Sequence, residues 1–451
     1  MRKVVRRAFS ELIGSIGQFD RLIDRLLIDM GCALLLIFSH FPHLAVPNKL
    51  KGVIVKTVPT FQVVVVGGGL AGATASKFLT EQGLSVITLE KSLSFGDHIT
   101  CGEAVQDWVL KELGFHDPAP VVDSRIEKVT LKLGERSKTF YVPGISIVDK
   151  RALIRQLVTE SVRNGGKAVS NARFTGLRFM DDGKIEVEWL HRGKEMKVTA
   201  DFVIAADGAT SNVCQAAGCG RPEEIIHGVN SLMLHGSFRE GEMIFFVGPE
   251  FGKGYGWAFS KGDSISNVGV CGGNVDAVMR NFDHIIAENY AGASVLSYGM
   301  KPIPVGMRKK VAQNGVFAVG DAGSFVEPLS YAGMWGAVMS ARMASKHIVR
   351  FYHGDHKSKK EAIRGFLKDV KKEFSLRFKL AALAVSAFQG MNEQDWQDFF
   401  DSLDANFPDG RVGDVDPFRL AGIFLKDRKL RRILRGKLSN AILAVIQRAI
   451  S

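Results

Sequence analysis

Hydrophobic residues follow two different patterns in the first half of this 451-residue chain. Residues 63–66 and 84–89 are nearly continuous apolar runs, the pattern of parallel strands that are buried on both faces. Residues 125–148, 184–190 and 197–204 instead alternate polar and apolar positions, which predicts half-exposed strands, the last two as a hairpin. The mixture predicts a parallel sheet that carries additional antiparallel strands.

The second half changes pattern twice. Residues 227–310 consist mostly of alternating runs, which predicts a mainly antiparallel sheet. Residues 316–319 return to a buried strand, a helix is expected to begin near Ala332, and the chain is helical from Lys357 onward. The fold class predicted is therefore α/β, with a Rossmann-type domain, an inserted antiparallel-sheet domain, and helical N- and C-terminal segments.

These patterns divide the chain into five parts. We expect an amphipathic helical extension, the first part of a dinucleotide-binding domain, an antiparallel-sheet substrate domain, the second part of the dinucleotide-binding domain, and a helical C-terminal region. Their predicted ranges are 1–58, 59–226, 227–312, 313–350 and 351–451.

The N-terminal extension has one apolar helical face. Its apolar residues recur at alternating steps of four and three, while its basic residues lie elsewhere. The apolar positions are Val5, Phe9, Leu12, Ile16, Phe19, Ile23 and Leu26. Such a helix lies in a membrane interface or packs against protein, and periodicity does not separate the two. The most apolar stretch, residues 30–41, is too short to span a bilayer by itself and has no small-residue cleavage site after it.

Charge points to an anionic partner. The chain has a formal net charge of +12, and residues 426–437 contain seven Lys and Arg against one Asp. Aliphatic rather than aromatic residues separate these basic positions, so a membrane surface is favoured over nucleic acid. A C-terminal helix that docks on the protein with a solvated basic face is the alternative. The five cysteines include no C-x-x-C pair, which disfavours zinc and a disulfide framework.

The motif with the clearest chemistry follows the first buried strand. Gly67, Gly69 and Gly72 form G-x-G-x-x-G at the start of a predicted helix. This spacing permits a tight turn, close approach of the backbone to a pyrophosphate, and close packing of helix on strand. Glu90 ends the second strand, where a carboxylate can accept hydrogen bonds from a ribose. A dinucleotide site is therefore predicted.

A second segment, far along the chain, narrows the cofactor to a flavin. Asp321 follows a late buried strand and can bind the hydroxyls of a ribityl chain. Gly333 and Met334 open the next helix, whose N-terminal amides would face the pyrimidine edge of the ring and favour an anionic reduced flavin. Because both segments are present, we predict bound FAD.

The order of motifs resembles the geranylgeranyl reductases, FAD enzymes of the p-hydroxybenzoate hydroxylase-like group. The resemblance covers about residues 61–350 and rests on the sequences GGGLAG, CGEA, DKR, ADGATS, GYGWAF and AVGDAGSFVEPLSYAGM. It implies that Cys101, Gly102 and Ala104 lie along the flavin ring together with Gly333 and Met334, and that Arg151 lies near the ADP half of FAD.

The resemblance also implies which residues contact the substrate. Tyr255, Trp257 and Phe259 alternate on one strand, so their rings share one face and would line a channel for an isoprenoid chain. Periodicity alone favours the alternative, a sheet face packed in the core. The family's motif continues with proline where this chain has Ser260, so the turn after Phe259 and the substrate choice can differ.

The family chemistry is saturation of C=C bonds in geranylgeranyl chains, most plausibly on membrane ether phospholipids. Cys101 and Glu103 are the nearest candidates for the proton donor, and Cys101 equally can serve only to pack against the ring. Since a second nucleotide fingerprint was not found, electrons are expected from an external donor such as ferredoxin, NAD(P)H or a deazaflavin.

The resemblance further implies a cytoplasmic protein that is peripheral on the inner face of the cell membrane. Two alternatives remain open. One is a flavin monooxygenase or halogenase of the same fold. The other is a membrane-tethered electron-transfer flavoprotein that passes electrons to a quinone.

Overall fold

The computed structural model describes residues 58–97, 99–116, 119–234 and 240–411. The predicted N-terminal amphipathic helix, the apolar stretch at 30–41 and the basic C-terminal segment therefore lie outside the described residues. None of the helices in the described part is long and apolar enough to cross a membrane.

The first sheet is built around a parallel core. Its order is β15-β16-β9-β1-β2-β6, and β7 and β8 continue from β9 as antiparallel strands. The C-terminal ends of the two central strands, Val63–Val66 and Phe202–Ala205, are buried, as expected of apolar runs in a parallel sheet that is covered on both faces. The bounds are β1 Thr60–Val66, β2 Val86–Leu89, β6 Lys167–Val169, β7 Ala172–Phe179, β8 Ile185–His191, β9 Lys194–Ala205, β15 Ala312–Gln313 and β16 Val316–Ala318.

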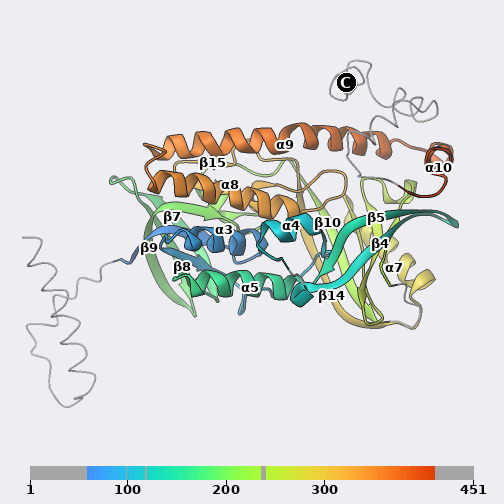
Figure 1. The fold of residues 1–451 in the computed structure, drawn as a ribbon, viewed down its shortest axis with the longest axis horizontal. Coiled ribbons are helices and arrows are strands. Elements are labelled where there is room, and N and C mark those ends of the chain that lie inside the picture. The colour runs from blue at the N-terminus through green and yellow to red at the C-terminus, as the bar shows by residue number, and fades with distance from the viewer. Residues whose placement is uncertain (1–57, 98, 117–118, 235–239, 412–451) are drawn as a thin grey trace, which may run out of the picture. The chain divides into compact units, whose positions relative to one another are not determined.

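Four helices enclose one face of this sheet with a continuous apolar core, whereas β7, β8 and the short helix α6 (Asn212–Ala216) cover a second core on the other face. Figure 1 shows α8 and α9 running side by side above α3. The four helices are α3 Leu70–Glu81, α5 Lys150–Arg163, α8 Met334–Tyr352 and α9 Lys359–Gln389. The predicted Rossmann-type arrangement is confirmed.

The second sheet has the order β14-β10-β13-β12-β11-β4-β5-β3. It recruits strands from residues 104–148 as well as from the region after residue 224, and β11 pairs with β4 in parallel. Its strands are β3 Ala104–Gln106, β4 Val122–Leu133, β5 Arg136–Val148, β10 Glu224–Leu234, β11 Glu242–Phe246, β12 Tyr255–Gly262, β13 Ile265–Gly272 and β14 Ser294–Val305.

Helices α7 and α10 pack against this second sheet. Helix α7 (Val275–Asn289) buries Val278, Phe282 and Ile285 against it, and α10 (Glu393–Asn406) packs on β5. Helix α7 was not predicted, although Asn274 caps its N-terminus and its apolar residues have helical spacing. Short elements complete the chain: α4 Asp107–Glu112 and the 3-10 turns η2 Ala119–Val121, η3 Pro249–Phe251 and η4 Gly320–Gly323.

Candidate functional site

The turn from β1 to α3 gives each glycine of the fingerprint a distinct physical role. Gly67 has φ +103°, and a Cβ there would lie 2.2 Å from the Ala206 carbonyl oxygen. A Cβ at Gly72 would lie 1.9 Å from the Gly67 carbonyl oxygen, so the helix can approach the strand only with glycine. A Cβ at Gly69 would meet no atom within 4 Å, because this position borders an open cleft.

This cleft fits the pyrophosphate and ribose of a dinucleotide. Gly69 is the N-cap of α3 and has no side chain to cap the helix, so the first amides of α3 remain available to an anion. Glu90 also lines the cleft and is held in place by the turn. Its Oε2 accepts a hydrogen bond from the Gly68 amide at 2.7 Å, and its Oε1 accepts one from the Ser92 amide at 2.8 Å.

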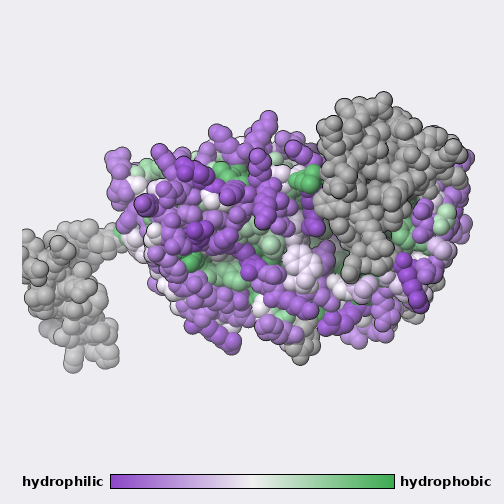
Figure 2. Space-filling view, turned by 45° about the horizontal axis from the view of Figure 1, so that its top comes forward, coloured by the Kyte–Doolittle hydropathy of each residue, from purple (hydrophilic) through white to green (hydrophobic). Residues whose placement is uncertain are grey.

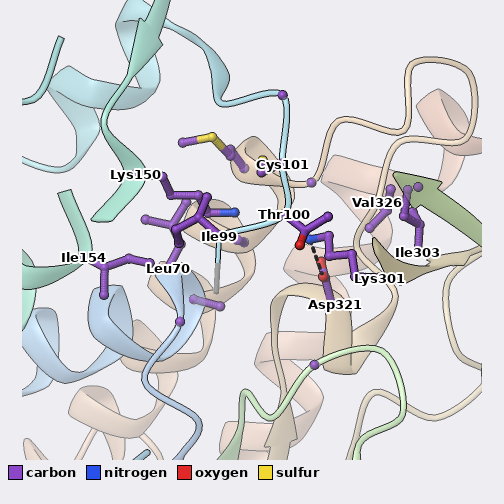
Figure 3. Close-up of a pocket in the computed structure, with 18 of the residues that line it drawn as sticks. Leu70, Ile99, Thr100, Cys101, Lys150, Ile154, Lys301, Ile303, Asp321 and Val326 are labelled. Atoms are coloured by element: carbon purple, nitrogen blue, oxygen red, sulfur yellow. Dashed lines mark ion pairs between the residues drawn. The ribbon is translucent and has the colours of Figure 1, made fainter. Parts of the chain in front are cut away.

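The second predicted segment reaches the same cleft. Asp321 lies in η4, and Gly333 and Met334 lie at the start of α8; all three line the cleft. Figure 3 shows Lys301, from β14, pointing toward Asp321, with 3.7 Å between Nζ and Oδ2. Segments about 230 residues apart in sequence, at Glu90 and Asp321, are thus brought together, as the flavin prediction requires.

Cys101 and Gly102 lie on the cleft wall, and buried amides hold this segment. The Cys101 carbonyl oxygen accepts a hydrogen bond from Asn267 Nδ2 at 2.6 Å and one from Asn230 Nδ2 at 3.4 Å. A Cβ at Gly102 would lie 2.8 Å from the Phe259 ring, so the segment packs directly on β12. These contacts hold the backbone at Cys101, and the Cys101 sulfur accepts a hydrogen bond from the Glu103 amide at 3.4 Å.

The side chain of Glu103, the other candidate proton donor, binds Lys261, Asn267 and the backbone of Lys150. Its Oε2 accepts hydrogen bonds from Lys261 Nζ at 2.7 Å and Asn267 Nδ2 at 3.3 Å, and its Oε1 accepts one from the Lys150 amide at 3.1 Å. Glu103 also has φ +62° and is not among the described residues that line the cleft. Both carboxylate oxygens of Glu103 are thus engaged by protein groups, and the segment next to Cys101 is held in place.

Tyr255, Trp257 and Phe259 all line the cleft, so their rings share one face of β12 (Tyr255–Gly262) as the alternation predicted. Adjacent ring centroids along the strand lie 6.1 and 6.2 Å apart. Trp257 Nε1 donates a hydrogen bond to Asn267 Oδ1 at 3.1 Å, so its one polar atom is satisfied away from the cleft. The strand therefore presents a continuous aromatic surface beside Cys101.

Two further predicted residues lie just outside. Ala104 begins β3 and packs in the apolar cluster that contains Trp257 and Phe259. Arg151 is exposed on α5, and its side chain lies against Gly96, which does line the cleft. Neither is among the described residues of the lining.

The cleft also contains residues that the sequence did not single out as functional. Lys150 precedes Arg151 and lines the cleft (Figure 3). Burial lowers the pKa of Lys150, but the nearby Cys101, Asp321 and Glu103 outweigh that effect and place the pKa above its usual value. A cation is thus maintained next to Cys101. In the sequence, Lys150 is the middle residue of the DKR motif, from which only Arg151 was predicted to be functional.

Tyr331 and Cys271 also line the cleft, and the sequence did not predict either of them as a site residue. Tyr331 lies two residues before Gly333 in a loop without periodicity. Burial raises the pKa of Cys271 to about 12, so its thiol stays neutral.

Comparisons with known proteins bear on the fold and the cofactor. The family described as "FAD binding domain" matches residues 60–236. A digeranylgeranylglycerophospholipid reductase of Methanocella arvoryzae is 29% identical over 64% of this chain and 77% of its own length. One from Methanosarcina acetivorans is 24% identical over 83% of this chain and 95% of its own length.

Solved structures show the same fold. A geranylgeranyl bacteriochlorophyll reductase-like protein of Thermoplasma acidophilum has a TM-score of 0.77 at 18% identity and covers 84% of this chain and 100% of its own. A myxobacterial chondrochloren halogenase has a TM-score of 0.62 at 19% identity, covering 85% and 91%. The predicted FAD-binding fold, the FAD cofactor and the resemblance to geranylgeranyl reductases are confirmed.

Proposed function

We propose that this FAD-dependent oxidoreductase saturates C=C bonds of geranylgeranyl or related polyprenyl chains, on membrane ether phospholipids. The observation that carries the proposal is that three aromatic rings of β12 line the same cleft as Gly69, Asp321 and Cys101. An apolar chain lying on this surface would be next to the residues expected to hold the flavin.

The cofactor would be held by residues from both parts of the FAD-binding domain. Gly69 and Glu90 would hold its ADP half, in a turn that Gly67 and Gly72 permit by their lack of side chains. Asp321 would hold the ribityl chain, and Gly333 and Met334 the pyrimidine edge of the ring. Reduced FAD supplies a hydride from N5. The protein's contribution is to align an unpolarised double bond with that atom and to exclude water.

Cys101 is the candidate for delivery of the proton. Its backbone is fixed by Asn267 and Asn230, and the ammonium of Lys150 lines the same cleft. The raised pKa of Lys150 keeps this ammonium charged at neutral pH, so it would stabilise the thiolate that remains after the thiol has given up its proton, and that proton would be regained from water. Aromatic side chains on β12 would meanwhile limit the access of water.

The substrate class is supported by the names of the relatives, which are digeranylgeranylglycerophospholipid reductases. A lipid substrate implies contact with a membrane, and we propose a cytoplasmic protein that binds peripherally to the inner face. Exposed lysine and arginine residues along α9 are suited to an anionic surface: Lys360, Arg364, Lys368, Lys371, Lys372 and Lys379. Figure 2, in which the top of Figure 1 comes forward, shows a mostly hydrophilic face. The electron donor is proposed to be external, of the ferredoxin, NAD(P)H or deazaflavin type.

Product analysis separates this proposal from its alternatives. Holoenzyme reduced with dithionite is incubated anaerobically with a geranylgeranyl ether lipid, and the product is weighed. A gain of two hydrogens per double bond supports the reductase. An oxygenated or halogenated product formed only after oxygen is admitted would identify a monooxygenase or halogenase. Flavin oxidation by a quinone, with the lipid unchanged, would identify an electron carrier.

A further inference from the structure

We propose that Tyr331 is a fixed stop at one end of the aromatic surface and sets the length of prenyl chain that the cleft accepts. This inference rests on the proposed function for the identity of the ligand. It concerns a residue to which neither the predicted motif nor the fold assigns a role.

Tyr331 extends the aromatic surface from another part of the chain. Its ring stacks on that of Tyr255, with centroids 6.0 Å apart and planes inclined by 11°. Phe259, at the other end of the row, lies against Gly102 beside Cys101. The ring of Tyr331 therefore lies at the end of the row that is farther along β12 from Cys101, and both tyrosines line the cleft.

The backbone at Tyr331 is unusual for such a large residue. Its φ of +52° lies in the left-handed region, which glycine and asparagine adopt far more readily than aromatic residues do. Such conformations persist where the surrounding contacts overdetermine them, and they concentrate at functional sites. Glycine would fit this backbone without strain, but it would leave the end of the aromatic surface open.

Reciprocal hydrogen bonds hold the two rings. The Tyr331 hydroxyl donates to the Lys253 carbonyl oxygen, and the Tyr255 hydroxyl donates to the Ser330 carbonyl oxygen. Burial raises the pKa of both phenols, so both remain donors at neutral pH.

The loop that carries Tyr331 is itself braced. Glu327 Oε2 accepts hydrogen bonds from the Ser330 amide at 2.6 Å and the Leu329 amide at 3.2 Å. The ring pair is consequently a rigid wall and not a swinging gate.

The test compares three variants of the FAD-loaded protein. Tyr331→Gly and Tyr331→Asn both suit a left-handed backbone and remove the ring, whereas Tyr331→Phe keeps the ring and loses one hydrogen bond. Affinities for farnesol, geranylgeraniol and geranylfarnesol are measured with oxidised holoenzyme through the flavin spectrum. Thermal unfolding and FAD content confirm that each variant is folded and loaded.

We expect wild type and Tyr331→Phe to bind the longest alcohol less well than geranylgeraniol. In the Gly and Asn variants, the affinity ratio of longest to middle alcohol should rise by about tenfold or more, the discrimination typical of a few methylenes in an apolar site. Equal changes for all three alcohols, or an unchanged ratio in both folded variants, would overturn the inference. A shifted ratio in a protein that reduces none of these chains would leave the stop intact and defeat the proposed reductase function.

Discussion

Gly69 and Gly72 lie three residues apart in one turn but face opposite constraints. A methyl group at Gly69 would project into the open cleft, whereas at Gly72 it would strike the Gly67 carbonyl oxygen. We expect Gly69→Ala to fold like wild type without FAD but to bind FAD at least about tenfold more weakly, or about 1.4 kcal/mol. Gly72→Ala should destabilise the apoprotein by roughly 1–3 kcal/mol through overpacking. Unfolding of the apoproteins and FAD titration measure the two effects, and equal apoprotein destabilisation by both substitutions would contradict the assignment.

Substitution of Cys101 tests whether its thiol delivers the proton to the substrate. Cys101→Ala should lower the rate of prenyl reduction by about 10²–10⁴-fold while FAD content stays the same, because general acid catalysis contributes on that order. Cys219→Ala provides a matched control, since Cys219 is a buried cysteine that is not among the described residues of the cleft. A fully active Cys101→Ala variant would limit Cys101 to packing against the ring and require another proton donor.

The residues that sequence reasoning found and missed differ in a physical way. Gly67, Glu90 and Asp321 each follow a buried strand, a position that the sequence pattern identifies, and the backbone at Gly67 leaves no room for a Cβ. Lys150 and Tyr331 carry no such local constraint in the sequence. Lys150 becomes significant only because folding places it beside Cys101, and Tyr331 only because folding stacks its ring on Tyr255 of β12.

At the scale of elements, the stability that the contact between α8 and α9 contributes should depend on pH. His347 on α8 is buried, its Nδ1 lies 2.9 Å from His356 Nε2, and its Nε2 lies 3.0 Å from Asp369 Oδ2. Gly365 on α9 makes room for the imidazole, because a Cβ there would lie 2.4 Å from Nδ1. Burial lowers the pKa of His347 more than Asp369 raises it.

The folded state therefore binds a proton at His347 less readily than the unfolded state does. Its contribution to stability is complete above the unfolded pKa of about 6.5 and is lost as the pH falls through the lower folded value. Urea unfolding should show a lower midpoint at about pH 5.5 than at about pH 7.5, and His347→Gln should reduce this difference. The same pH dependence in wild type and His347→Gln would contradict the assignment.

Elements were predicted well where one pattern extended over a whole segment. The buried run of β1 and the alternation of β12 each reflect a single environment along the strand. Helix α7 was missed because its helical spacing lies between alternating runs that belong to β13 and β14. The second sheet also draws β3, β4 and β5 from early in the chain, a pairing between distant segments that no local pattern encodes.

For the whole molecule, the membrane proposal depends on a segment outside the described residues. Residues 420–450 combine apolar residues with a basic row, a composition expected of an interfacial helix, and the apolar residues include Ile423, Phe424, Leu430, Ile433, Leu434, Ile442 and Val445. Truncation after Asp416 should reduce flotation of the protein with anionic liposomes and leave FAD content unchanged. Undiminished flotation would contradict a role for this segment and would assign the membrane contact to another surface, such as the basic residues along α9.

The central claim is that one cleft brings a flavin and a prenyl chain together. A single turnover tests it most directly: anaerobically reduced holoenzyme, freed of excess reductant, is mixed with a geranylgeranyl lipid while flavin absorbance is followed. The account predicts that the flavin is reoxidised without oxygen, with one flavin oxidised for each double bond lost, and that Trp257→Ala slows the reaction. Flavin that stays reduced until oxygen or a quinone is added, with the lipid unchanged, would contradict it.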